Sequence, residues 1–183
     1  MAPADLPAGA VSPADGKEAA AIQARVLEVV AGLGLPYEIV PCEESLADTA
    51  AFCAAYGYQP EDSANTIVVV GKADPPRYAA CVLLATTRLD VNRTVRSRLG
   101  TRKASFAGAE ETRRLTGMAI GGVTPFALPA GLALWVDARV MTRPRIVLGG
   151  GSRSVKVVGP PQLLTSLGGV EVVEGLAEEP PPA

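Results

Sequence analysis

Two apolar runs near the middle of the chain constrain its fold most strongly. Thr66 to Val70 is β-branched throughout, and Tyr78 to Ala85 is almost continuously apolar. The segment between them, GKADPPR, begins with glycine and contains two prolines, which suits a loop. Because β-branched residues favour strands and short continuous apolar runs are typical of buried ones, the pattern predicts a hairpin of two buried strands.

Helical periodicity and further β-branched runs fill the rest of the chain. Glycine or proline follows several helical segments and predicts their ends, and Asp90 is placed to cap the helix after it. The patterns predict helices over residues 17–33, 46–56, 90–99, 108–115 and 160–167, and short strands over 37–40, 132–136, 145–148, 154–158 and 170–173.

These elements predict a single α+β domain in which helices flank a mixed sheet. The chain has 183 residues, of which 48% are hydrophobic, so it is long enough for one domain with a substantial core. We expect this domain to span residues 17–175. Residues 1–16, rich in alanine, proline and glycine, are expected to be a flexible lead-in, and residues 176–183 a flexible tail.

The residue types present exclude several kinds of site. The chain has no histidine, which excludes Ser-His-Asp and Cys-His nucleophile systems and any His-ligated metal. Its three cysteines are irregularly spaced, cannot supply a four-cysteine zinc site, and fit a reducing cytosol. No stretch reaches the roughly 18 apolar residues of a membrane span, and the first residues lack the pattern of a signal peptide. We expect a cytoplasmic protein without metal, cofactor or membrane.

Charge is segregated along the chain. Residues 1–71 carry a net charge of −8 and residues 72–156 a net charge of +10. The basic residues are densest over 88–107, which suits phosphate contacts, whereas Phe106 is the single aromatic residue there for base stacking. A basic middle is compatible with a polyanionic partner held by one face, or with arginines that only solvate the surface.

The segment 117–129, GMAIGGVTPFALP, is uncharged, glycine-rich and broken by two prolines. Glycines let a backbone approach a ligand closely, and their N–H groups can hold an oxyanion or position a carbonyl group. Gly121, Gly122, Thr124 and Pro125 are therefore candidates for the floor of a site. The alternative is a plain structural turn.

Two further stretches are weaker candidates. LGGGSRS, residues 148–154, contains consecutive glycines that can cradle an anion, but it lies between two predicted strands, where a hairpin turn is the simpler interpretation. Asp137 follows the apolar strand LALWV and suits either a turn cap or a functional carboxylate.

Together these stretches resemble the YbaK/ProX-type aminoacyl-tRNA editing domains, over roughly residues 20–175. The similarity rests on NTIVVVGK, YAACVLLATTRLDVNRTVRSRLGTRKASFA, ETRRLTGMAIGGVTPFALP, VDARVM and GGGSRSVKVVGPPQL, which occur in the family's order. The resemblance implies a compact α+β fold with a central mixed, barrel-like sheet. It also implies hydrolysis of the ester that links a wrong amino acid to the 3′ end of tRNA, by a free-standing protein acting in trans.

The resemblance also implies roles for particular residues. The family's Gly-x-x-x-Pro motif falls on Gly121 and Pro125, so this loop, with Gly122 and Thr124, would position the ester and the attacking water. The terminal hydroxyl of the tRNA would assist, so neither histidine nor metal is needed. We further expect substrate contacts from Asp137, Gly149, Gly150 and Ser152, and tRNA contacts from Arg88, Arg93, Arg96 and Lys103.

Asn65 departs from the family pattern, because the family usually has a lysine there. Asparagine keeps a hydrogen-bond donor but loses a charge-assisted contact of about 1.5–3 kcal/mol. Three explanations stay open: another cation substitutes, with Lys103 and Arg88 as candidates, or the substrate differs, or the deacylase activity is weak. Two functions stay open: a trans-acting aminoacyl-tRNA deacylase, or a non-catalytic relative that binds tRNA, an aminoacyl-nucleotide or a synthetase. The amino acid removed and the oligomeric state are not specified by the sequence.

Overall fold

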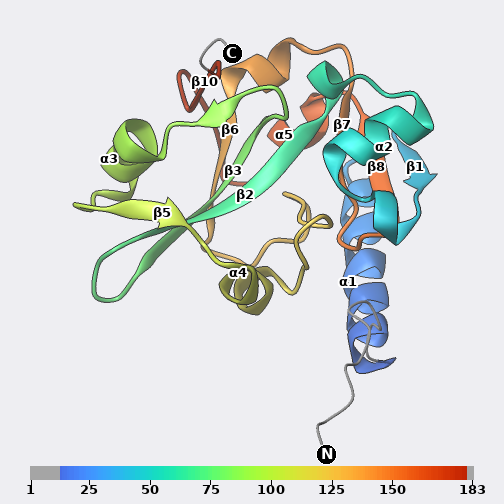
Figure 1. The fold of residues 1–183 in the computed structure, drawn as a ribbon, viewed down its shortest axis with the longest axis horizontal. Helices are drawn as coiled ribbons and strands as arrows, with labels where there is room; N and C mark the ends of the chain where they lie inside the picture. Colours follow the sequence, from blue (N-terminus) through green and yellow to red (C-terminus); the bar gives the residue numbers. More distant parts are fainter. Residues whose placement is uncertain (1–12, 181–183) are drawn as a thin grey trace, which may run out of the picture.

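The predicted hairpin forms the centre of the fold. A computed structural model describes residues 13–180, and in it β2 (Ala64–Gly71) pairs antiparallel with β3 (Arg77–Leu84) over their whole length (Figure 1). β5 (Ala104–Phe106) extends the sheet antiparallel to β2, while β6 (Ala133–Asp137) and β9 (Val170–Val173) extend it in parallel beyond β3. The strand order β5-β2-β3-β6-β9 makes this a mixed sheet, as predicted.

A second, antiparallel sheet adjoins the first. Its order is β1 (Glu38–Pro41), β8 (Val155–Gly159) and β7 (Ile146–Gly149). Ser63, just before β2, forms a parallel bridge with Val147 of β7 and so joins the two sheets. β7 and β8 pair antiparallel across the predicted glycine-rich turn.

Helices flank these sheets, and most lie where the periodicity predicts them. α1 (Pro13–Gly32) and α2 (Thr49–Tyr56) lie beside the three-stranded sheet in Figure 1, whereas α3 (Arg96–Leu99) lies at the opposite end of the central sheet. The other helical segments are α4 (Ala109–Thr116), α5 (Gln162–Thr165), η1 (Glu44–Leu46), η2 (Pro60–Asp62), η3 (Val91–Val95) and η4 (Ala138–Thr142). The predicted α+β class, a mixed sheet with flanking helices, is confirmed.

The side chains of β3 alternate between two cores, because a strand points successive residues to opposite faces. Ala80 and Val82 belong to a core that includes α1 and α5, whereas Ala79 and Cys81 belong to one on the other face. Both faces of β3 are therefore buried, which explains its continuous apolar run. Burial of each valine or leucine stabilises the fold by about 1.5–3 kcal/mol.

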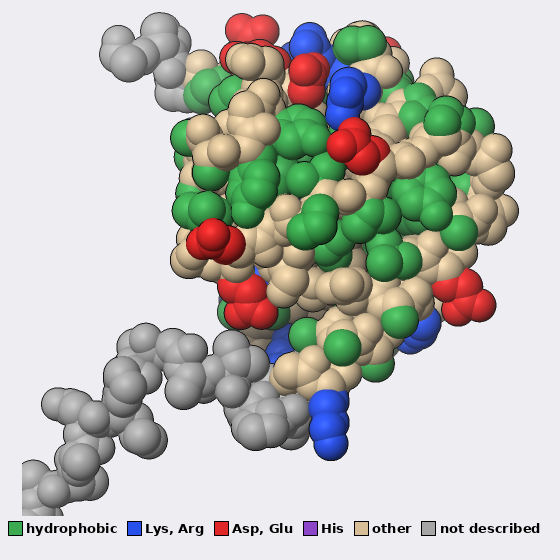
Figure 2. All heavy atoms as spheres, turned by 90° about the vertical axis from the view of Figure 1, so that its right-hand side faces the viewer, with side chains coloured by type: hydrophobic (Ala, Val, Ile, Leu, Met, Phe, Trp, Pro, Cys, Tyr) green, Lys and Arg blue, Asp and Glu red, His purple; other side chains and the backbone are tan. Residues whose placement is uncertain are grey.

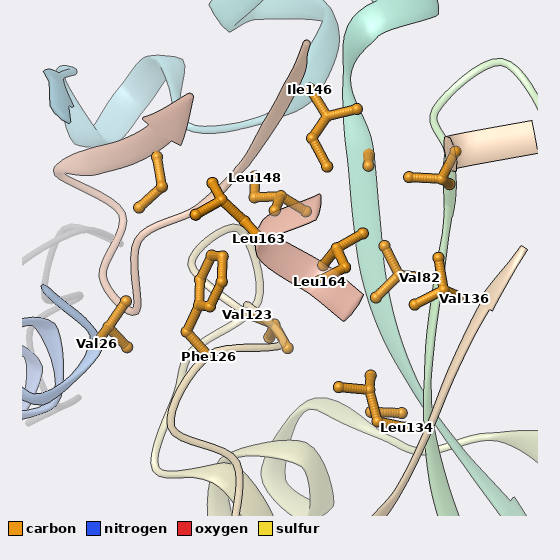
Figure 3. Close-up of a cluster of buried hydrophobic side chains, with 14 of the residues drawn as sticks. Val26, Val82, Val123, Phe126, Leu134, Val136, Ile146, Leu148, Leu163 and Leu164 are labelled. Atoms are coloured by element: carbon orange, nitrogen blue, oxygen red, sulfur yellow. The ribbon is translucent and has the colours of Figure 1, made fainter. Parts of the chain in front are cut away.

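The first core also explains why the segment 117–129 is so apolar. Met118 and Phe126 are fully buried within it. Figure 3 shows Phe126 among side chains from other elements, including Leu163 of α5. Part of the segment is thus inserted into the core, while Ala119 and Ile120 are exposed.

The chain termini differ in part from the prediction. The first residues expected in the flexible tail are ordered: Leu176 is fully buried in the second core, and β10 (Ala177–Glu178) pairs with β4 (Arg88–Leu89). Residues 13–16 of the expected lead-in belong to α1. Residues 1–12 and 181–183 lie outside the described part of the chain. None of the helices in residues 13–180 is long and apolar enough to cross a membrane.

Candidate functional site

A cavity of about 280 Å³ lies along one edge of β2. β5 pairs with residues 69–71 of β2, and β7 bridges Ser63, so the edge between these two points has no strand beside it. The N-terminal part of α2, the 117–129 loop, β7, β8 and α4 close the space around that edge. The cavity therefore occupies the place where the two sheets separate.

The cavity brings together residues from three of the stretches singled out in the sequence. Asn65, Gly121 and Gly149 all line it. The Oδ1 atom of Asn65 accepts a hydrogen bond from Thr49 Oγ1 at 2.9 Å, which ties β2 to α2. The side-chain nitrogen of Asn65, Nδ2, has no hydrogen-bond partner among the described residues, so it remains available as a donor at the cavity wall.

The 117–129 loop packs tightly against the turn between β7 and β8. Gly121 has φ of +92°, and a Cβ atom there would lie 2.2 Å from Arg153 Nη1. A Cβ atom on Gly122 would lie 2.6 Å from the backbone of Ser152, and one on Gly149 would lie 2.4 Å from the carbonyl oxygen of Val123. Gly122 and Gly149 are therefore required by their packing against backbone, independently of any ligand, and Gly121 by its positive φ together with the nearby guanidinium.

The groups that the 117–129 loop presents to the cavity differ from those predicted. The Gly122 N–H donates to the carbonyl oxygen of Ala119, so it closes a turn instead of pointing at a ligand. Thr124 and Pro125 are buried outside the cavity lining. The group that Gly121 presents is its carbonyl oxygen, which accepts a hydrogen bond from the side chain of Lys156.

Lys156 also lines this cavity, although it was not predicted as a site residue from the sequence. It lies on β8, opposite Gly149 of β7, and is 7% exposed. Its Nζ atom donates to the carbonyl oxygens of Ala47 at 2.6 Å and Gly121 at 3.1 Å, and lies 5.6 Å from the ring of Phe52. Burial lowers the pKa of Lys156. Two signals could have found it: its place in the family-like stretch GGGSRSVKVVGPPQL, and a lysine set between valines in the strand VKVV.

The basic residues expected to supply the missing cation do not line the cavity. Arg88 on β4 and Lys103 before β5 are both exposed. Arg93 pairs with Asp90 and Glu178 at 3.3 and 3.5 Å. Arg93 and Arg96 belong to η3 and α3, far from α2 in Figure 1. Contacts of these four residues with tRNA stay a prediction.

The side chains of Asp137 and Ser152, predicted to contact substrate, instead make hydrogen bonds within the protein. Asp137 is buried, and its carboxylate accepts hydrogen bonds from the N–H groups of Arg139 at 3.1 Å and Ala177 at 2.8 Å. Ser152 Oγ donates to Gln23 Oε1 at 2.6 Å. Neither side chain lines the cavity, and neither does Gly150.

The surroundings of the cavity are poor in charge. Lys156 and Asp48 are the only charged residues among the described residues that line it. Figure 2 shows the face that carries α2 and β1, where hydrophobic and uncharged atoms cover most of the centre. No group of three or more acidic residues or cysteines in the described residues is arranged to hold a metal ion. Chemistry at this site would use the lysine, backbone groups, an amide and hydroxyls.

Comparisons with known proteins agree with this architecture. The family model for the aminoacyl-tRNA editing domain matches residues 43–167, more than half of the chain. The hypothetical protein APE2540 is 26% identical, with a TM-score of 0.74 over 84% of this chain and 99% of its own. A candidate trans-editing enzyme for prolyl tRNA synthetase is 24% identical, with a TM-score of 0.72 over 93% of this chain and 100% of its own. The chain belongs to the aminoacyl-tRNA editing domain family.

Proposed function

We propose that this protein is a trans-acting aminoacyl-tRNA deacylase, which hydrolyses the ester between a wrongly attached amino acid and the 3′ end of tRNA. The observation that carries the proposal is the cavity at the edge of β2, where Asn65, Gly121 and Gly149 meet. Family membership supports it, as does the similarity of fold to a candidate trans-editing enzyme for prolyl tRNA synthetase. We place its action in the cytoplasm, with aminoacyl-tRNA as substrate and a synthetase as a further partner.

The geometry suits ester hydrolysis without an ionised base. The loop at Gly121 and the strand at Asn65 form opposing walls, between which the aminoacyl ester would lie. Water would attack the carbonyl carbon of the ester, and the free hydroxyl of the terminal ribose would orient that water. Backbone groups, an amide and hydroxyls line the cavity, and fixed donors of this kind can stabilise the charge that develops on a reacting ester.

A panel of mischarged tRNAs tests this proposal. Each is incubated with a high concentration of purified protein, and loss of the ester is followed against buffer alone. Deacylation of at least one mischarged tRNA, with the matched correctly charged tRNA left intact, is expected. If no tRNA in the panel loses its amino acid faster than in buffer, the protein is not a deacylase of this kind.

Asn65 favours a second function, in which the protein binds tRNA, an aminoacyl-nucleotide or a synthetase without hydrolysis. Such a protein would bind deacylated tRNA with an affinity that falls steeply with salt, and would not turn over. Asn65→Lys separates the two functions. A large gain in deacylation would mean that the natural protein has lost catalytic efficiency, whereas a loss would mean that Asn65 belongs to a differently built active site.

A further inference from the structure

One ammonium group is buried in the cavity without an acidic partner at ion-pair distance. No carboxylate in residues 13–180 pairs with the Nζ atom of Lys156, although the side chain is 93% buried from solvent. The nearest acidic influence is Asp48, but that carboxylate is exposed and pairs with Arg153 at 3.6 Å. A buried charge without a pair is unfavourable, and such groups are found at functional sites.

The neighbours of Lys156 hold its ammonium group in place but leave one of its N–H donors without an acceptor. An ammonium group has three N–H donors, and two are accepted by the carbonyl oxygens of Ala47 and Gly121. The ring of Phe52 lies 5.6 Å away and stabilises the positive charge on another side. One N–H therefore has no acceptor among residues 13–180, and the side chain that carries it lines the cavity.

The wall around Lys156 is built to let it reach the cavity. Gly149 lies directly opposite on β7 and lines the same cavity, while the backbone of the 117–129 loop packs against it. Asn65 lines the same cavity from β2 but carries no charge. The positive charge of this site is thus carried by Lys156 on β8 and not by a residue of β2.

We propose that Lys156 is a catalytic residue, whose third N–H donates to the carbonyl oxygen of the scissile aminoacyl ester. This inference rests on the proposed deacylase function. A single buried donor suits one carbonyl oxygen, whereas a phosphate group carries more charge and needs several donors. The ligand is therefore the aminoacyl ester and not the phosphate backbone.

The step that Lys156 assists is ordinary ester hydrolysis. The oxygen of water bonds to the carbonyl carbon, and the electron pair of the C=O double bond moves to the carbonyl oxygen. Lys156 stabilises the resulting oxyanion. When the carbonyl re-forms, the bond to the ribose oxygen breaks and that oxygen takes a proton originating from the water. The products are a free amino acid and a tRNA with a free hydroxyl, and the lysine is unchanged.

Lys156→Met tests the inference, with Lys17→Met as the matched control. Lys17 is an exposed residue of α1 that does not line the cavity. Loss of an oxyanion donor lowers kcat by about 100- to 1000-fold. We expect that loss for Lys156→Met and none for Lys17→Met, while the affinity of both variants for deacylated tRNA stays that of the wild type. A Lys156→Met variant that is folded and within threefold of wild-type kcat overturns the inference.

A binding measurement separates this inference from the proposed function. The probe is an aminoacyl-adenosine in which an amide replaces the ester, so that it binds without hydrolysis. If the wild type is inactive on every tRNA yet binds the probe more than tenfold tighter than Lys156→Met does, the deacylase function fails and the ester contact stands. If the wild type deacylates tRNA, and Lys156→Met binds the probe and deacylates tRNA as well as the wild type does, the deacylase function stands. The contact between Lys156 and the ester is then wrong.

A pH profile with Lys156→Arg decides the case in which Lys156→Met does not fold. The lysine is active when protonated, so the enzymatic rate above buffer is expected to fall as pH rises through its lowered pKa. Arginine stays protonated throughout, so this fall should disappear in Lys156→Arg. Cys42, Cys53, Asp48 and Arg153 also act on Lys156, and all are retained in the variant. An unchanged alkaline limb in Lys156→Arg contradicts the contact.

Discussion

Gly121 gives the sharpest test of how the glycine-rich loop is held. Its φ of +92° is unfavourable for any residue with a Cβ atom, and a Cβ atom would also lie 2.2 Å from Arg153 Nη1. That guanidinium donates to the carbonyl oxygen of Ile120 at 2.9 Å and to that of Glu44 at 2.9 and 3.2 Å. Gly121→Ala should therefore impose backbone strain and also push Arg153 away from at least one acceptor.

Gly131→Ala separates backbone strain from displacement of Arg153, because it imposes the strain alone. Its φ is +84°, and a Cβ atom there would meet nothing within 4 Å. Backbone strain of about 1–2 kcal/mol is expected for Gly131→Ala. Gly121→Ala should lose about 1.5 kcal/mol more, the lower end for a hydrogen bond to a charged group, because the contact is exposed.

Urea denaturation of the wild type and both variants measures these free energies of unfolding. The difference between the two variants isolates the contribution of Arg153, since the strain is common to both. If Gly121→Ala and Gly131→Ala destabilise the protein equally, Arg153 does not hold the loop, and the explanation given for the glycine at position 121 is wrong.

Three other substitutions and one labelling reaction test separate parts of the fold. Thr66 Oγ1 is buried without a hydrogen-bond partner, so Thr66→Val should leave the free energy of unfolding unchanged or raise it by about 1–3 kcal/mol. Thr116 Oγ1 accepts a hydrogen bond from the N–H of Met118 at 3.1 Å, so Thr116→Val should lower the free energy of unfolding by about 1–3 kcal/mol in the same urea titration. If Thr66→Val proves more destabilising than Thr116→Val, the hydrogen-bond argument is wrong. Leu176 is fully buried, and Leu176→Ala should cost about 2–5 kcal/mol, whereas a truly flexible tail would show no change. Burial raises the pKa of Cys81 to about 12, so in native protein this thiol should not react with a thiolate-specific reagent at pH 8, and mass spectrometry should find it labelled only after unfolding.

The fold followed from the sequence wherever one pattern fixed both the type and the ends of an element. The hairpin of β2 and β3 has one of the strongest such patterns, and its register runs from Ala64 opposite Leu84 to Gly71 opposite Arg77. β4, β5 and β10 have two or three residues each, too few for a period to appear. Their existence depends on tertiary contacts, such as the hydrogen bond from the N–H of Ala177 to Asp137.

The site was less predictable, because its chemistry depends on which side chains share one cavity. Asn65 and Gly121 were predictable from motifs, since each belongs to a stretch with an unusual composition or a family pattern. Lys156 lies in the family-like stretch GGGSRSVKVVGPPQL, but nothing in that pattern singled out the lysine as a site residue. A lysine between valines is typical of an edge strand with one solvent-exposed face, and only the packing of α2 and the 117–129 loop over β8 turns that face inward.

The two interpretations of the 117–129 segment, structural turn and floor of a site, describe one arrangement. Gly121 must lack a side chain because Arg153 lies against it, and this close approach directs the carbonyl oxygen of Gly121 toward Lys156. The packing that requires glycine is thus the packing that anchors a buried ammonium group. Gly121→Ala should therefore reduce deacylation beyond its effect on stability, because it moves an acceptor of the group proposed to stabilise the oxyanion. At a temperature where both variants are fully folded, Gly121→Ala should be slower than Gly131→Ala, and equal rates would separate the loop from the chemistry.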